Sequence, residues 1–152
     1  MSTQVREKVQ GDKVIQFSVF MENKVGRLLD IVRLLESADI HIIAISIIDT
    51  ADCAIDRFVT DDPDRTRQLL NQEGLTHTET NLVVVEMGGA TDLKKVLTAL
   101  LQGECNLHFT YSLMIQPRGK PCLALHVEDE ECASSVLKTN GFKILTQREI
   151  SR

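Results

Sequence analysis

Aromatic residues are scarce in this sequence, which has no tryptophan, one tyrosine and five phenylalanines among its 152 residues. The few that occur are scattered, and no stretch concentrates lysine and arginine. Proteins that bind nucleic acid need a concentrated basic face for the phosphates. Because the net charge is also −5, we expect no nucleic-acid partner.

Long apolar runs are absent as well. The runs that occur, such as residues 42–45, are far shorter than the roughly 20 apolar residues that a membrane-spanning helix needs. Residues 1–13 are polar and lack the apolar centre of a secretory signal. We therefore expect no membrane partner and a cytoplasmic location.

The cysteines and histidines form no recognisable ligand set. Four cysteines occur, at Cys53, Cys105, Cys122 and Cys132, and no two of them make a C-x-x-C pair. Without a secretory signal, such thiols stay reduced and pack as small hydrophobic side chains. The four histidines are not spaced as paired ligands, so we expect neither a structural disulfide nor a metal site.

Catalytic motifs are also missing. The sequence contains no G-x-S-x-G elbow, no P-loop and no G-x-G-x-x-G fingerprint. Gly88-Gly89 stands between an expected strand and an expected helix, but the Lys-Ser/Thr of a phosphate loop does not follow. We expect no catalytic residues and no cofactor, and hence a protein that is not an enzyme.

Hydrophobic periodicity predicts the order strand, helix, strand, strand, helix, strand, and then the same order again. The first pass has strands at 14–21, 40–49 and 54–60, an extended segment from Thr76, and helices at 26–37 and from Asp62-Pro63 to near Gly74. The second has strands at 82–87, 107–115, 122–128 and 142–147, and helices at 92–101 and 129–140. Leu93, Val96, Leu97, Leu100 and Leu101 are expected on one buried helix face.

The two passes align at an offset of about 65 residues, which indicates an internal duplication. Leu28, Val32 and Leu35 then match Leu93, Leu97 and Leu100. Each copy is a βαββαβ unit, so we predict an α+β fold of two ferredoxin-like units in tandem, whose antiparallel sheets carry helices on one face. The expected domains are residues 13–80 and 81–149.

The strand at 40–49 is apolar on both faces. Ile42, Ala44 and Ile48 fall on one face by alternation, and Ile43, Ile45 and Ile47 fall on the other. Helices cover only one face, so the other needs a cover: the N-terminal tail, the other repeat or a partner chain. We expect a homodimer.

The first strand leads into the loop Asn23-Lys24-Val25-Gly26-Arg27-Leu28, and residues 54–61 read AIDRFVTD. With the duplicated topology, these segments resemble the ACT domain, over about residues 13–148, as two units in tandem. The resemblance implies a non-catalytic regulatory protein that binds an amino acid or related metabolite where the first loop of one unit meets the second strand of another. The residues implied for ligand binding are Glu22, Asn23, Val25, Gly26, Arg27, Leu28, Asn106, Leu107 and His108.

The second copy departs from the loop motif. Gly88 stands at the position of Asn23 and Thr91 at that of Gly26, so we expect one asymmetric site per chain. Capping of the first helix is an alternative role for Asn23. Two alternatives to ligand binding also stay open: a regulatory or structural subunit of an amino-acid biosynthetic enzyme, similar to the acetohydroxyacid synthase small subunit, with no ligand of its own, and a metal-sensing ferredoxin-like module.

Overall fold

The computed structural model describes residues 13–22 and 26–151, which fold into two compact units. The N-terminal unit is Ile15–Thr80, and the C-terminal unit is Asn81–Ile150 together with Lys13 and Val14. The described residues form β1 (Val14–Met21), α2 (Arg27–Ser37), β2 (Ile42–Asp49), β3 (Ala54–Thr60), α3 (Pro63–Gln72), β4 (His77–Glu86), α4 (Asp92–Gln102), β5 (Leu107–Ser112), β6 (Cys122–Val127), α5 (Glu130–Thr139), β7 (Lys143–Leu145) and α6 (Gln147–Ile150).

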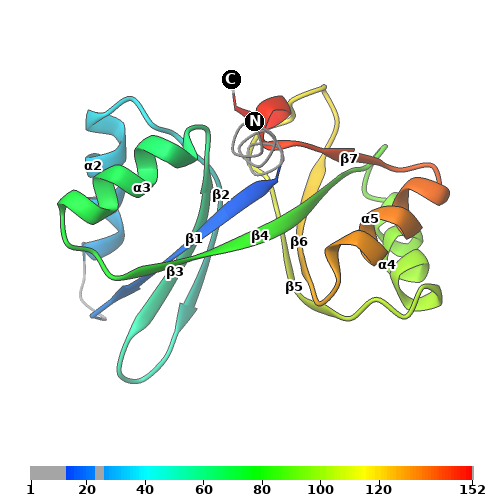
Figure 1. The fold of residues 1–152 in the computed structure, drawn as a ribbon, viewed down its shortest axis with the longest axis horizontal. Helices are drawn as coiled ribbons and strands as arrows, with labels where there is room; N and C mark the ends of the chain where they lie inside the picture. The colour runs from blue at the N-terminus through cyan, green and yellow to red at the C-terminus, as the bar shows by residue number, and fades with distance from the viewer. Residues whose placement is uncertain (1–12, 23–25, 152) are drawn as a thin grey trace, which may run out of the picture. The chain divides into compact units, whose positions relative to one another are not determined.

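The N-terminal unit has the strand order β2-β3-β1-β4, and α2 and α3 lie together on one face of this sheet (Figure 1). β3 pairs antiparallel with both β1 and β2, and Phe17 lies directly opposite Phe58. The core under the helices is Phe17, Val19, Ile31, Leu35, Ile40, Phe58 and Leu70.

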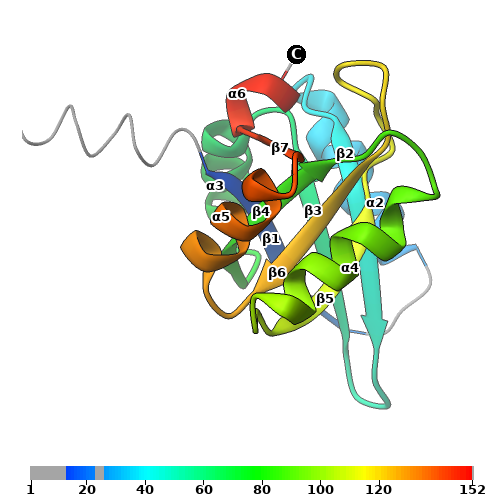
Figure 2. The same cartoon turned by 90° about the vertical axis from the view of Figure 1, so that its right-hand side faces the viewer.

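The C-terminal unit repeats this arrangement. Val84 of β4 lies opposite Ala124 of β6 and also opposite Leu145 of β7, so the order is β5-β6-β4-β7. The helices α4 and α5 lie over the sheet on one face (Figure 2). β4 is thus the last strand of one βαββαβ unit and the first strand of the next, which confirms the predicted α+β fold with two ferredoxin-like units.

The second helix of each unit starts at an aspartate whose side chain caps it. Asp62 accepts a hydrogen bond from the Arg65 backbone N–H at 3.1 Å, and Pro63 is the first helical residue, as predicted. Asp129 caps α5 in the same way through the Cys132 backbone N–H at 3.0 Å. The two helices that follow the first strand of each unit, α2 and α4, have no side-chain cap among the described residues.

The predicted alternation in β2 is wrong at its start. The register shifts between Ile42 and Ala44, so that Ile42 and Ile45 pack against the same core. The strand also begins later than expected, because α2 closes with the Ile40 N–H bonded to the Leu35 carbonyl at 2.9 Å.

The predicted buried face of α4 is too wide. Val96 and Leu100 are buried, whereas Leu93, Leu97 and Leu101 lie 41%, 40% and 78% exposed. The helix meets the sheet along a narrow stripe that includes Ala99, so the neighbouring leucines lie outside the contact.

The last strand is also shorter than expected. The strand β7 ends at Leu145, because Thr146 and Glu149 form a reciprocal capping box that starts α6: the Thr146 N–H donates to Glu149 Oε1 and the Glu149 N–H to Thr146 Oγ1. None of the helices in the described ranges is both long and apolar enough to cross a membrane.

Candidate functional site

The loop between β1 and α2 holds most of the predicted ligand-binding residues. Asn23 and Val25 lie outside the described residues. Gly26 occupies the N-cap position of α2 with φ 88°, a left-handed conformation that favours glycine. A Cβ at Gly26 would meet nothing within 4 Å, so the backbone angle rather than crowding explains the glycine. Glu22 and Arg27 are exposed and Leu28 is half-buried.

The start of α2 is suited to an anion. The first backbone N–H groups of any helix lack partners inside the helix and carry a partial positive charge. At α2 no described side chain caps them, and the Gly26 carbonyl accepts the first intrahelical bond from the Asp30 N–H at 3.0 Å. A carboxylate or similar anion would satisfy these N–H groups.

The corresponding loop of the C-terminal unit is closed by its own carboxylate. The Gly88 N–H donates to Asp92 Oδ2 at 2.7 Å, and Lys95 Nζ lies 3.6 Å from Asp92 Oδ1. A Cβ at Gly88 would lie only 3.0 Å from Asp92 Oδ2, so a glycine fits best here. Both helices carry an aspartate in the first turn, Asp30 in α2 and Asp92 in α4, so the bond from the Gly88 N–H to Asp92 is what distinguishes the second loop.

A buried carboxyl, which sequence reasoning did not select, lies in the N-terminal unit. Asp56 of β3 is 3% exposed and lies opposite Val19 of β1 and Ile47 of β2. No hydrogen bond or ion pair engages it within residues 13–22 and 26–151, and burial raises its pKa. A buried carboxyl without a partner is costly to ionise, so this position favours a cationic group that would pair with it.

Comparison of the two units shows that the fold does not require Asp56. Asp62 and Asp129 cap the second helix of each unit and therefore mark equivalent positions. Counting back the same number of residues from each cap places Leu123 at the position equivalent to Asp56. Leu123 lies opposite Val85 on β4 and belongs to the core of the C-terminal unit, where an apolar residue is expected. The signal in the sequence was an aspartate at a core-facing strand position, two residues before the buried Phe58.

Asp56 lies close to the end of the sheet at which the chain leaves for α2. β1 ends at Met21, which is opposite Ala54, and Val19 is opposite Asp56 two residues away. Two strand residues span about 7 Å. The helix start that no described side chain caps and the carboxyl without a described partner therefore belong to the same end of the N-terminal unit.

The remaining predicted residues lie at the start of β5 in the C-terminal unit, with Asn106 just before the strand and Leu107 and His108 as its first two residues. Asn106 Nδ2 donates to Glu128 Oε2 at 2.6 Å, and the Glu128 N–H donates to the Asn106 carbonyl at 3.0 Å. Leu107 packs against the C-terminal core. His108 is exposed, with its ring centroid 4.9 Å from that of His126. Of these three residues, Asn106 lines a pocket.

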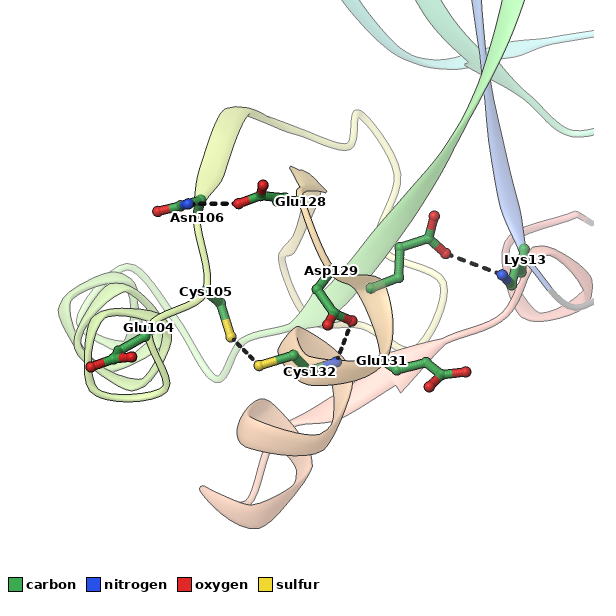
Figure 3. Close-up of a pocket in the computed structure, with 9 residues that line it drawn as sticks. Lys13, Glu104, Cys105, Asn106, Glu128, Asp129, Glu131 and Cys132 are labelled. Carbon is green, nitrogen blue, oxygen red and sulfur yellow. Dashed lines mark hydrogen bonds and ion pairs between the residues drawn. The ribbon is translucent and has the colours of Figure 1, made fainter.

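That pocket has a volume of about 550 Å³ and lies wholly in the C-terminal unit (Figure 3). Lys13 Nζ pairs with Glu130 Oε2 at 3.3 Å on one side of it. The Cys105 and Cys132 sulfur atoms lie 2.9 Å apart on another. No group of residues in the described part of the chain is arranged to hold a metal ion. The full lining is Lys13, Glu104, Cys105, Asn106, Glu128, Asp129, Glu130, Glu131 and Cys132.

Solved structures with this arrangement come from several proteins. A protein from Bacteroides thetaiotaomicron is 24% identical, with a TM-score of 0.83 over 92% of this chain and 96% of that one. The ligand-free regulatory subunit of aspartate kinase from Thermus thermophilus is 12% identical, with a TM-score of 0.59 over 83% and 89% of the two chains. A structure of aspartokinase alpha and beta subunits is 17% identical, with a TM-score of 0.53 over 84% and 97%. At these identities the likeness shows the fold alone.

The search of curated proteins found no match. A family profile described as an ACT domain pair matches residues 12–152. The matched region covers both βαββαβ units. The chain therefore belongs to the ACT domain family, as an ACT domain pair.

Proposed function

We propose that this protein is a non-catalytic regulator that binds an amino acid or a related zwitterionic metabolite at the start of α2. The observation that carries the proposal is that one end of the N-terminal unit holds both a helix start that no described side chain caps and a buried carboxyl that has no described partner. Membership of a family of regulatory domains supports it.

The two features have the opposite charges that a zwitterion needs. In the proposal the ligand carboxylate accepts hydrogen bonds from the first N–H groups of α2, and its ammonium group donates to Asp56. Each charge-assisted contact contributes roughly 1.5–3 kcal/mol. After the costs of binding, a few such contacts give micromolar to millimolar affinity, which suits the sensing of a metabolite.

The proposal retains Glu22, Asn23, Val25 and the Gly26–Leu28 segment as residues of the ligand site. It also retains Asn106, Leu107 and His108, at the start of the second strand of the C-terminal unit, as contributors where the first loop of one ACT unit meets the second strand of another. Support for these latter contributors comes from the family resemblance, and support for a homodimer comes from the two apolar faces of the strand at 40–49. Ligand binding would change how the units pack and so regulate a partner protein.

The direct test is a thermal-shift screen of the twenty amino acids, followed by calorimetry on any that respond. A ligand at about 100-fold its Kd stabilises the native state by roughly 2.7 kcal/mol, which is a shift of several degrees. Asp56→Asn should abolish the response, because the ammonium acceptor loses its charge. Asp52→Asn, in the exposed turn next to β3, is the matched control and should keep the response. A response that survives Asp56→Asn would contradict the proposed role of Asp56.

A second candidate is a regulatory subunit of an amino-acid biosynthetic enzyme that has no ligand of its own. The similarity in fold to the regulatory subunit of aspartate kinase from Thermus thermophilus favours it. This candidate predicts no response to any amino acid in the same screen. It predicts instead that the protein co-purifies with a metabolic enzyme of its own cell, and a pull-down followed by activity assays of the captured enzyme checks this.

A further inference from the structure

Two of the four cysteines, far apart in the sequence, meet in the C-terminal unit. The sulfur atoms of Cys105 and Cys132 lie 2.9 Å apart, across a separation of 27 residues. Both are free thiols, and both lie 3.6 Å from the carbonyl oxygen of Gly103. Cys53 and Cys122 instead contact oxygen atoms, Thr50 Oγ1 and the Lys120 carbonyl, each at 3.5 Å.

We propose that Cys105 and Cys132 form a redox-active dithiol, which small disulfides of the glutathione class oxidise to an intramolecular disulfide. The proposal is independent of amino-acid binding. It differs from the expectation that all four thiols act only as small hydrophobic residues, because the fold brings these two into contact.

The pair is accessible from solvent through the 550 Å³ pocket that both cysteines line (Figure 3). The two thiols differ in exposure: Cys105 is 8% exposed, whereas Cys132 is half-buried. A reagent that enters the pocket therefore reaches Cys132 more readily than Cys105. This difference assigns Cys132 as the attacking thiol and Cys105 as the resolving thiol.

The burial of Cys105 agrees with this assignment. Cys132 is in the first turn of α5, where its backbone N–H donates to Asp129 Oδ1 and its position is fixed. Burial, the contact with Cys132 and the charge of Asp129 raise the pKa of Cys105 to about 11. Cys105 is thus a poor nucleophile toward an external reagent, and it reacts only with a sulfur that is already beside it.

The chemistry balances as two thiol–disulfide exchanges. The Cys132 thiolate attacks one sulfur of the small disulfide, forms a mixed disulfide and releases one small thiolate. Cys105 then loses its proton to solvent and attacks the Cys132 sulfur, which releases the second small thiolate. The protein loses two electrons, and the small disulfide gains them.

The backbone around the pair is already held in place. Cys105 leads into β5, where the Asn106 carbonyl accepts from the Glu128 N–H at 3.0 Å, and Asp129 caps α5 through the Cys132 N–H. A disulfide would cross-link these two segments across the pocket. Because the loop that it closes is 27 residues long, oxidation should raise the Tm by several degrees.

The test is oxidation of the reduced, full-length protein with excess oxidised glutathione, read by intact mass, thiol titration and peptide mapping. The expected result is the loss of two of the four thiols, a mass lower by two hydrogens and a Cys105–Cys132 cross-linked peptide that dithiothreitol reverses. Cys53→Ser and Cys122→Ser are the matched controls, and they should form the same disulfide.

The two site variants separate the roles of the thiols. Cys105→Ser should stop at the mixed disulfide, with one glutathione on Cys132, whereas Cys132→Ser should form neither product. If either serine variant fails to fold, differential alkylation of the reduced native protein tests the same order of reactivity, with Cys132 expected to react before Cys105. Four thiols that persist after oxidation, or a disulfide that involves Cys53 or Cys122, would overturn the proposal.

Discussion

Replacement of Asp56 by leucine should make the protein more stable and deprive it of its ligand response. The carboxyl is 3% exposed, faces the core and has no partner in the described part of the N-terminal unit. Burial of an unsatisfied polar group costs roughly 1–3 kcal/mol. Leucine is the residue that the C-terminal unit carries at the matching position, Leu123, so the substitution suits the fold.

The pH dependence of the stability gained in Asp56→Leu shows whether the gain comes from removal of the buried carboxyl. Burial raises the pKa of Asp56 above its ordinary value of 3.8, so the folded protein holds this proton to a higher pH than the unfolded chain does. Between the two values the folded state binds more protons, and stability therefore falls as pH rises. The difference between Asp56→Leu and wild type should be largest near neutral pH and should shrink toward pH 3.8.

Urea denaturation followed by circular dichroism, at pH 7 and at pH values below the folded pKa of Asp56, measures this difference. The exposed Asp52→Leu variant should change stability by no more than about 0.5 kcal/mol. Replacing a residue that is kept only for structure lowers the stability of the protein, whereas replacing a residue that is kept for binding raises it. If Asp56→Leu instead lost more than about 1 kcal/mol and kept a response to amino acids, the reasoning would be refuted.

Two further predictions test the packing. Arg67→Ala should cost up to about 1 kcal/mol at neutral pH, because its guanidinium makes two bonds to Glu79, at 2.8 and 2.6 Å. The bond to Arg67 lowers the pKa of Glu79 below 4.5. The stabilisation by this ion pair is therefore present above pH 4.5 and is lost as pH falls through the lowered pKa. A pH series of denaturation curves measures it, with Arg65→Ala, on an exposed position of the same helix, as the control. Leu100→Ala should cost roughly 2–5 kcal/mol in urea denaturation, whereas Leu101→Ala, 78% exposed, should change stability by less than about 0.5 kcal/mol; similar losses for both variants would contradict the observed face of α4.

The fold was predictable because its local signals agree with one another. Apolar periodicity, the Asp62-Pro63 start of α3 and the left-handed Gly74 after it all mark the same boundaries. Periodicity does not show how wide a contact is, so the exposed leucines of α4 were missed. A single-residue register shift, such as the one after Ile42, leaves no signal in the alternation of residue types.

The candidate site was less predictable, because its residues are brought together by tertiary structure. No spacing rule pairs Cys105 with Cys132, since one ends the turn after α4 and the other lies in α5. Asp56 had a usable signal, a charged residue in phase with Phe58, but only the register with β1 shows that it is buried. Family resemblance pointed to the first loop without indicating a buried carboxyl at the same end of the N-terminal unit.

The two copies differ most at the features that a ligand site needs. The N-terminal unit combines a left-handed glycine at a helix start that no described side chain caps with a buried carboxyl that has no described partner. Of these features, the buried carboxyl is the one that is unfavourable for stability without a partner. In the C-terminal unit Asp92 closes the corresponding loop and Leu123 fills the corresponding core position. Because the same fold forms with a leucine in place of the buried carboxyl, the fold itself does not require Asp56, and the ligand proposed above gives a reason for its retention. The C-terminal copy also has a feature of its own, a contacting pair of thiols in a solvent-accessible pocket. The two duplicated units therefore carry different chemistry and are not two equivalent sites.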